Sequence, residues 1–72
     1  MVFAYIKVIS DKGYKEAGYR LTLPSIEDYY QHKEYYQQLA ITKMCIVRGW
    51  TVKDLHRYGY NKITAFFREN NL

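Results

Sequence analysis

Few side chains in this 72-residue sequence have the chemistry that catalysis or metal binding requires. The one cysteine, Cys45, lies in an apolar run, where a thiol most often fills the core, and no CxxC or Cys/His ligand spacing accompanies it. The two histidines, His32 and His56, are far apart in the chain, and Glu27-Asp28 suits a helix N-terminus. We therefore expect no catalytic residues, no metal site and no cofactor, and a protein that is not an enzyme.

Basic side chains are the chemistry that the sequence does concentrate. Residues 1–42 carry five basic and five acidic residues, whereas residues 43–72 carry six basic and two acidic ones, which accounts for the formal net charge of +4. Such asymmetry favours a polyanionic partner, of which nucleic acid is the simplest. Ordinary solubility is the alternative explanation, since a net charge of this size is common in small domains.

The elements that must position these charges begin with a β-hairpin over residues 1–23. Residues 2–9 are β-branched and aromatic, and residues 14–23 alternate apolar and polar side chains. Between them, Ser10-Asp11-Lys12-Gly13 has the composition of a turn in which the glycine takes a positive φ. A two-stranded hairpin is marginal alone, so we expect a helix against it.

A central helix is predicted over residues 25–48, with Ser25 as its N-cap and Gly49 after its end. Apolar residues recur along one side of it at helical spacing. A second apolar stripe opens on the opposite side at Tyr35, Leu39 and Ile46. Because a helix with two apolar sides lies between two layers, the second stripe contacts either the rest of the chain or a second copy.

Residues 51–70 complete a predicted α+β architecture, ββααα, with two short helices. Thr51 caps the first helix, Gly59 ends it, and Asn61 caps the second helix over residues 62–70. A short helix, a glycine-containing turn and a second helix resemble the helix-turn-helix DNA-binding domains, in which the second helix enters the major groove.

This resemblance implies a site for double-stranded DNA. The residues expected to contact DNA from the second helix and from its N-terminus are Asn61, Lys62, Thr64 and Arg68. The residues expected to contact the DNA backbone from the shorter helix are Lys53, His56 and Arg57. Because one recognition helix reads few base pairs, the implied protein is a small sequence-specific transcriptional regulator that acts as a homodimer. Its size would suit a phage or another mobile element.

Nine tyrosines in 72 residues support an alternative hypothesis. Tyr29, Tyr30 and Tyr36 form a strip on the central helix, and tyrosine gives large contact area at low entropic cost. The protein is then a small inhibitor or adaptor that binds a protein partner through this strip or through a free hairpin edge. Tyrosines also serve as stacking platforms for single-stranded nucleic acid.

Size and composition predict one soluble domain over residues 1–72. The apolar start is interrupted by Lys7 and lacks the basic n-region and cleavage site of a signal peptide. No apolar run approaches the ~18 residues needed to cross a bilayer, so we expect no membrane partner. One unpaired cysteine suits a reducing compartment, which favours the cytoplasm. A core of this size is close to marginal, and a homodimer would stabilise it.

Overall fold

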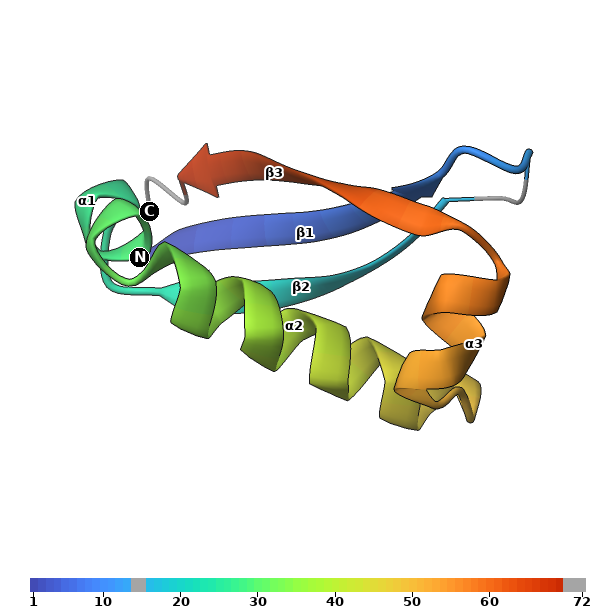
Figure 1. Ribbon diagram of the computed structural model, residues 1–72. Helices are drawn as coiled ribbons and strands as arrows, with labels where there is room; N and C mark the ends of the chain where they lie inside the picture. The colour runs from blue at the N-terminus through green and yellow to red at the C-terminus, as the bar shows by residue number, and fades with distance from the viewer. Residues whose placement is uncertain (14–15, 70–72) are drawn as a thin grey trace.

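The computed structural model describes residues 1–13 and 16–69. In that part of the chain, three strands and three helices follow one another in the order β1 (Val2–Ser10), β2 (Ala17–Leu23), α1 (Ile26–Gln31), α2 (Lys33–Arg48), α3 (Val52–Arg57) and β3 (Tyr60–Glu69) (Figure 1). The fold is α+β, as predicted.

The strands form one antiparallel sheet in the order β2-β1-β3. The N-terminal strand β1 is therefore central and pairs with the last strand of the chain as well as with its hairpin partner. Tyr5 of β1 lies opposite Arg20 of β2 and opposite Phe66 of β3. Residues directly opposite one another share a face of the sheet, so this register decides which side chains of the three strands lie together.

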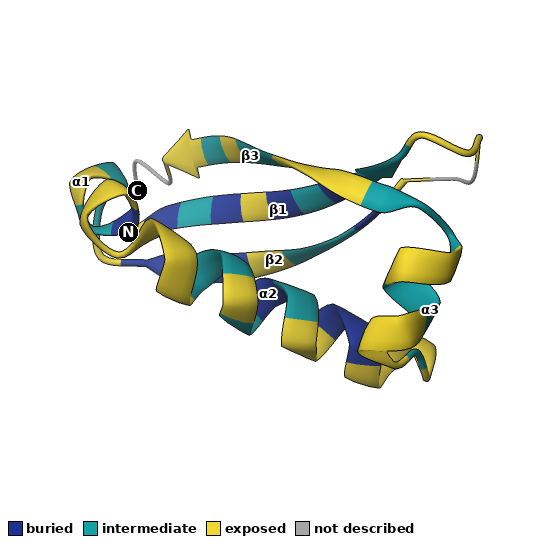
Figure 2. Ribbon diagram, in the orientation of Figure 1, coloured by how far each residue is buried: buried dark blue, intermediate teal, exposed yellow. Residues whose placement is uncertain are grey.

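The helices pack against one face of this sheet, and the core lies between them (Figure 2). Every second residue of β1 from Val2 to Val8 is buried there. The helix α2 packs on β2 and β1 through Ala40 and Met44, and α3 closes the end of the core through Leu55. Each fully buried apolar side chain contributes about 1.5–3 kcal/mol, which makes this alternation the main reason that β1 is a strand.

The predicted central helix over residues 25–48 is divided into two helices. Its ends are confirmed: the Ser25 hydroxyl accepts a hydrogen bond from the Asp28 N–H at 3.0 Å, and Gly49 follows α2 in the left-handed region with φ 70°. Between α1 and α2, His32 has φ −127° and ψ 38°, outside the helical region. The break gives α1 its own direction and seats Tyr29 in the core, with its ring 5.1 Å from that of Phe67 of β3.

The predicted helix over residues 62–70 is wrong, because residues 60–69 form the strand β3; Asn70 lies outside the described residues. The architecture is therefore ββαααβ, and the recognition helix implied by the helix-turn-helix resemblance is not formed. The sequence fits both periods, since Ile63, Phe66 and Phe67 share one side of a helix while Ile63, Ala65 and Phe67 share one face of a strand. The long-range pairing with β1 decides between them, because a hairpin alone is marginal and a third strand stabilises it.

The predicted second strand of the hairpin is confirmed from Ala17 to Leu23. Tyr14 and Lys15, where that strand was expected to begin, lie outside the described residues. The turn before them has the predicted positive φ at Gly13, 82°. No helix among the described residues is long and apolar enough to cross a membrane.

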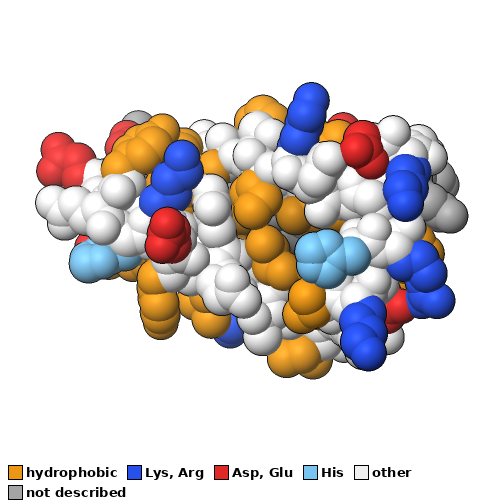
Figure 3. Space-filling view, viewed as in Figure 1, with side chains coloured by type: hydrophobic (Ala, Val, Ile, Leu, Met, Phe, Trp, Pro, Cys, Tyr) orange, Lys and Arg blue, Asp and Glu red, His pale blue; other side chains and the backbone are white. Residues whose placement is uncertain are grey.

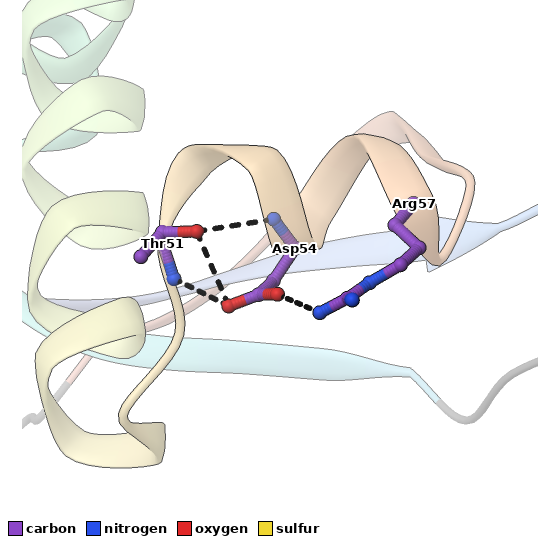
Figure 4. A network of polar contacts seen from close by, with 3 residues as sticks. All are labelled: Thr51, Asp54 and Arg57. Carbon is purple, nitrogen blue, oxygen red and sulfur yellow. Dashed lines mark hydrogen bonds and ion pairs between the residues drawn. The ribbon is translucent and has the colours of Figure 1, made fainter.

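The predicted short helix after Thr51 is confirmed as α3, and a capping box begins it (Figure 4). The Thr51 hydroxyl accepts a hydrogen bond from the Asp54 N–H at 3.3 Å, and the Thr51 N–H donates to Asp54 Oδ2 at 2.8 Å. Arg57 forms an ion pair with the same carboxylate from the next turn. The backbone N–H of Thr51, above all, holds the pKa of Asp54 below its usual value. Local chemistry thus fixes where α3 starts.

Candidate nucleic-acid interface

The face of the sheet opposite the helices, called the open face here, is built from the residues that alternate with the core. These residues are Phe3, Tyr5, Lys7 and Ile9 of β1, Gly18, Arg20 and Thr22 of β2, and Lys62, Thr64, Phe66 and Arg68 of β3. The register places them in cross-strand rows, so side chains from both ends of the chain meet on one surface.

Aromatic rings occupy the middle of the open face. Tyr5 and Phe66 lie directly opposite each other, and these residues are 42% and 53% exposed. Phe3 lies two residues before Tyr5 and on the same face of β1. Gly18 lies beside them, and a Cβ on it would stand 2.8 Å from Cζ of Tyr5. The Tyr5 ring therefore lies close over the β2 backbone.

Basic side chains surround these rings. The guanidinium carbon of Arg20 lies 5.3 Å from the centre of the Phe3 ring, and Nζ of Lys7 lies 4.9 Å from the centre of the Phe66 ring. Both distances are those of cation–π contacts. Lys7 also forms an ion pair of 2.9 Å with Glu16. With Lys62 and Arg68, the open face carries four basic side chains.

A hollow of about 330 Å³ lies among the rings and the arginines. Its lining consists of Phe3, Tyr5, Arg20, Phe66 and Arg68 of the open face, together with Phe67 and the acid Glu69 of β3. A volume of this size is at the lower end of the range for small-molecule sites. The hollow combines ring faces with two guanidinium groups, which is the chemistry that binds a planar group attached to an anion.

The structure divides the predicted DNA contacts between two surfaces. Lys62, Thr64 and Arg68 do share one face, but as alternating residues of a strand rather than as the outer side of a helix. Asn61 is not on it: its Nδ2 donates a hydrogen bond to Oδ2 of Asp11 at 2.7 Å.

The other predicted DNA contacts lie on α3, whose core side chain faces the helix-covered side of the sheet. Lys53, His56 and Arg57 are exposed there, and basic side chains gather over this end of the molecule in Figure 3. Arg57 is already engaged with Asp54 and lies 5.4 Å from the ring centre of Tyr58. Two separate basic surfaces therefore compete as the place where an anion binds.

The predicted tyrosine strip is not one surface. Tyr29 is 1% exposed and belongs to the core, so its assignment to a partner surface is wrong. Its ring packs against that of Phe67 of β3. Tyr36 is half-buried, and its hydroxyl donates to the Asp28 carboxylate, which raises the pKa of Tyr36. Tyr30 is 62% exposed and remains available to a partner.

Sequence reasoning missed Phe3, Tyr5, Arg20 and Phe66 as site residues. The signal was present in β1, where Phe3 and Tyr5 alternate with buried Val2, Ala4 and Ile6. This alternation alone did not indicate a binding surface, because the predicted helix over residues 62–70 placed Phe66 in the core instead of beside Tyr5.

Apolar side chains are also exposed on the helix-covered side. Figure 3 shows them gathered between β3 and α2. Of the second apolar stripe predicted on the central helix, Tyr35 is 64% and Ile46 is 73% exposed. The homodimer that this stripe was expected to serve stays a prediction.

No family model, curated protein or solved structure matches this chain significantly. In residues 1–13 and 16–69, no three histidine, cysteine or acidic side chains cluster as metal ligands would. The site is therefore interpreted from its own chemistry.

Proposed function

We propose that this protein binds nucleic acid with its open face. The observation that carries the proposal is the set of basic side chains around exposed rings: Arg20 beside Phe3, Lys7 beside Phe66, and Arg68 opposite Phe3. Lysine and arginine neutralise phosphates and release counterions, which supplies most of the affinity of non-specific binding. Rings among them offer contacts to bases.

The proposal keeps the ligand predicted from the charge pattern and moves its contacts from a helix to a strand. Lys62, Thr64 and Arg68, three of the seven predicted contacts, belong to the open face. A β-sheet can enter the major groove as a helix does, so a dimeric regulator on duplex DNA is one form of the proposed function.

A fluorescence-anisotropy titration tests the proposal, with labelled random single-stranded and duplex oligonucleotides at several salt concentrations. The test variant carries Arg20→Gln and Arg68→Gln. The matched control carries Lys33→Gln and Lys53→Gln, which removes the same charge from α2 and α3. The slope of the logarithm of the binding constant against the logarithm of the salt concentration is negative. Losing two phosphate contacts should reduce its magnitude by about 1.4 for single strands or about 1.8 for a duplex. The control should keep the wild-type slope.

Two results would contradict this proposal. Absence of binding at low salt would exclude nucleic acid as the ligand. A larger loss in the control than in the test variant would move the contact from the open face to the α3 end, where Lys53 lies.

A protein partner is the second candidate, supported by the exposure of Tyr30 and Tyr35 at 62% and 64%. Exposed tyrosines are enriched in binding surfaces because their large rings lose little entropy. The Tyr30→Ser and Tyr35→Ser substitutions would then lower the affinity of this protein for its partner. The Arg20→Gln and Arg68→Gln substitutions would leave that affinity unchanged, which is the reverse of the outcome for nucleic acid.

A further inference from the structure

From the aromatic centre of the open face we infer that its ligand is single-stranded nucleic acid, held by bases that stack on Phe66, Tyr5 and Phe3. This inference rests on the proposed function and narrows it to one class of nucleic acid. It follows from the position of the aromatic rings at the middle of the face and of the basic side chains around them.

The middle of the open face does not suit the grooves of a duplex. Base edges in a groove are recognised by hydrogen-bonding side chains such as arginine, asparagine and glutamine. Here the central row of the face holds Arg20, Tyr5 and Phe66, and two of these three side chains are aromatic rings. In a duplex the bases are already stacked on one another, so their faces are covered. An unpaired base leaves its face free for a ring.

The rings are held in place rather than packed away. Phe66 is 53% exposed although Lys7 approaches its ring, and Tyr5 is 42% exposed although it lies close over Gly18. Arg20 is similarly engaged with Phe3. Fixed side chains lose little further entropy when a base binds to them.

The hollow gives each part of a nucleotide a partner. The ring faces of Tyr5 and Phe66 would take the base, and the guanidinium groups of Arg20 and Arg68 would take the phosphate. Stacking tolerates every base because each has a π-face. We therefore expect weak sequence preference together with a strong preference for single strands over duplex.

The test compares oligothymidine with an oligonucleotide of the same length and charge whose internal bases are abasic. The variant is Phe66→Leu, which removes the ring and keeps an apolar side chain in β3. Phe66→Tyr restores a ring at the same position. Tyr35→Leu is the matched control, because it removes a similarly exposed ring from α2. Far-UV circular dichroism and thermal unfolding check that each variant is folded.

The inference predicts that the single strand binds more tightly than a duplex of equal length. Phe66→Leu should weaken oligothymidine binding by about 5- to 150-fold, because one base–ring stack is lost. It should leave the affinity for the abasic strand unchanged. Phe66→Tyr and Tyr35→Leu should bind as the wild type does.

Equal affinity for duplex and single strand would overturn the inference. So would a Phe66→Leu substitution that changes the binding of oligothymidine and of the abasic strand by the same factor, or that changes neither. If Arg20→Gln with Arg68→Gln still weakens binding in that case, only the stacking fails and the proposed function stands. Absence of binding to every oligonucleotide at low salt would remove both.

Discussion

Gly18 lies beneath the ring of Tyr5, and the absence of a side chain on Gly18 allows that ring to lie close over β2. A Cβ at this position would stand 2.6 Å from the carbonyl oxygen of Ile6 and 2.8 Å from Cζ of Tyr5. The tyrosine ring can swing away, but the carbonyl belongs to the central strand and cannot. The shape of the open face therefore depends on a glycine in the neighbouring strand.

Substitution Gly18→Ala should destabilise the fold although alanine is ordinarily the better residue in a strand interior by about 0.5–1 kcal/mol. Overpacking against backbone costs about 1–3 kcal/mol, so the unfavourable effect should win. Urea unfolding followed by circular dichroism measures the change in the free energy of unfolding. A midpoint equal to or above that of the wild type would show that the strands have more room than the structure indicates.

The capping box of α3 gives a prediction about stability. Thr51→Ala removes the hydroxyl that accepts the Asp54 N–H and should cost about 1 kcal/mol. In a domain of this size that loss lowers the melting temperature by about 4–8 °C. Thermal unfolding measures it, with Thr42→Ala, an exposed position within α2, as the control that should not be destabilised. An unchanged melting temperature for Thr51→Ala would mean that the cap does not hold α3.

Acid should weaken the same cap. The hydrogen bond from the Thr51 backbone N–H chiefly, and then the Thr51 hydroxyl and the Arg57 charge, lower the pKa of Asp54 in the folded protein. A carboxyl with a lowered folded pKa stabilises the fold above its unfolded value, near 3.9, and the contribution is lost as the pH falls through the folded pKa.

We therefore expect Asp54→Asn to be less stable than the wild type at neutral pH. The difference in the free energy of unfolding should shrink as the pH falls from the unfolded pKa of Asp54 through its lower folded pKa. Chemical unfolding of both proteins across that range measures it. A difference that stays constant with pH would show that the Asp54 charge is not involved.

The single thiol reports on the core. Cys45 is 8% exposed, and burial first, then the Asp54 carboxylate, raise its pKa, so the reactive thiolate is disfavoured. A disulfide exchange reagent should label it slowly in the native protein and rapidly in denaturant. Rapid, complete labelling of the native protein would contradict the packing of α2 against β1 and β2.

Local signals carried most of what the sequence could predict. The positive φ of Gly13, the Ser25 cap, the Gly49 end of α2 and the Thr51 cap of α3 are all confirmed, because each depends on neighbours a few residues away. The break at His32 was not predictable, since the apolar spacing runs through it.

The strand β3 is the main feature that the sequence left ambiguous, and the site depended on it. Ile63, Phe66 and Phe67 satisfy a helix as well as a strand, and the choice rests on pairing with β1 at the opposite end of the chain. Lys62, Thr64 and Arg68 share one face of β3, but the rings beside them could not be found without the sheet. The charge asymmetry of the sequence is the same whether residues 60–69 form a helix or a strand, whereas the position of the rings is not.

Binding to the open face is tested most directly by a nuclear magnetic resonance titration of the isotope-labelled 72-residue protein with a short single-stranded oligonucleotide. If the open face binds the single strand, the largest amide shift changes should fall on Tyr5, Arg20, Phe66 and Arg68, with the signals of α3 and of Tyr30 and Tyr35 little changed. Changes concentrated at Lys53 to Arg57, or on the exposed tyrosines, with the open face unaffected, would contradict it.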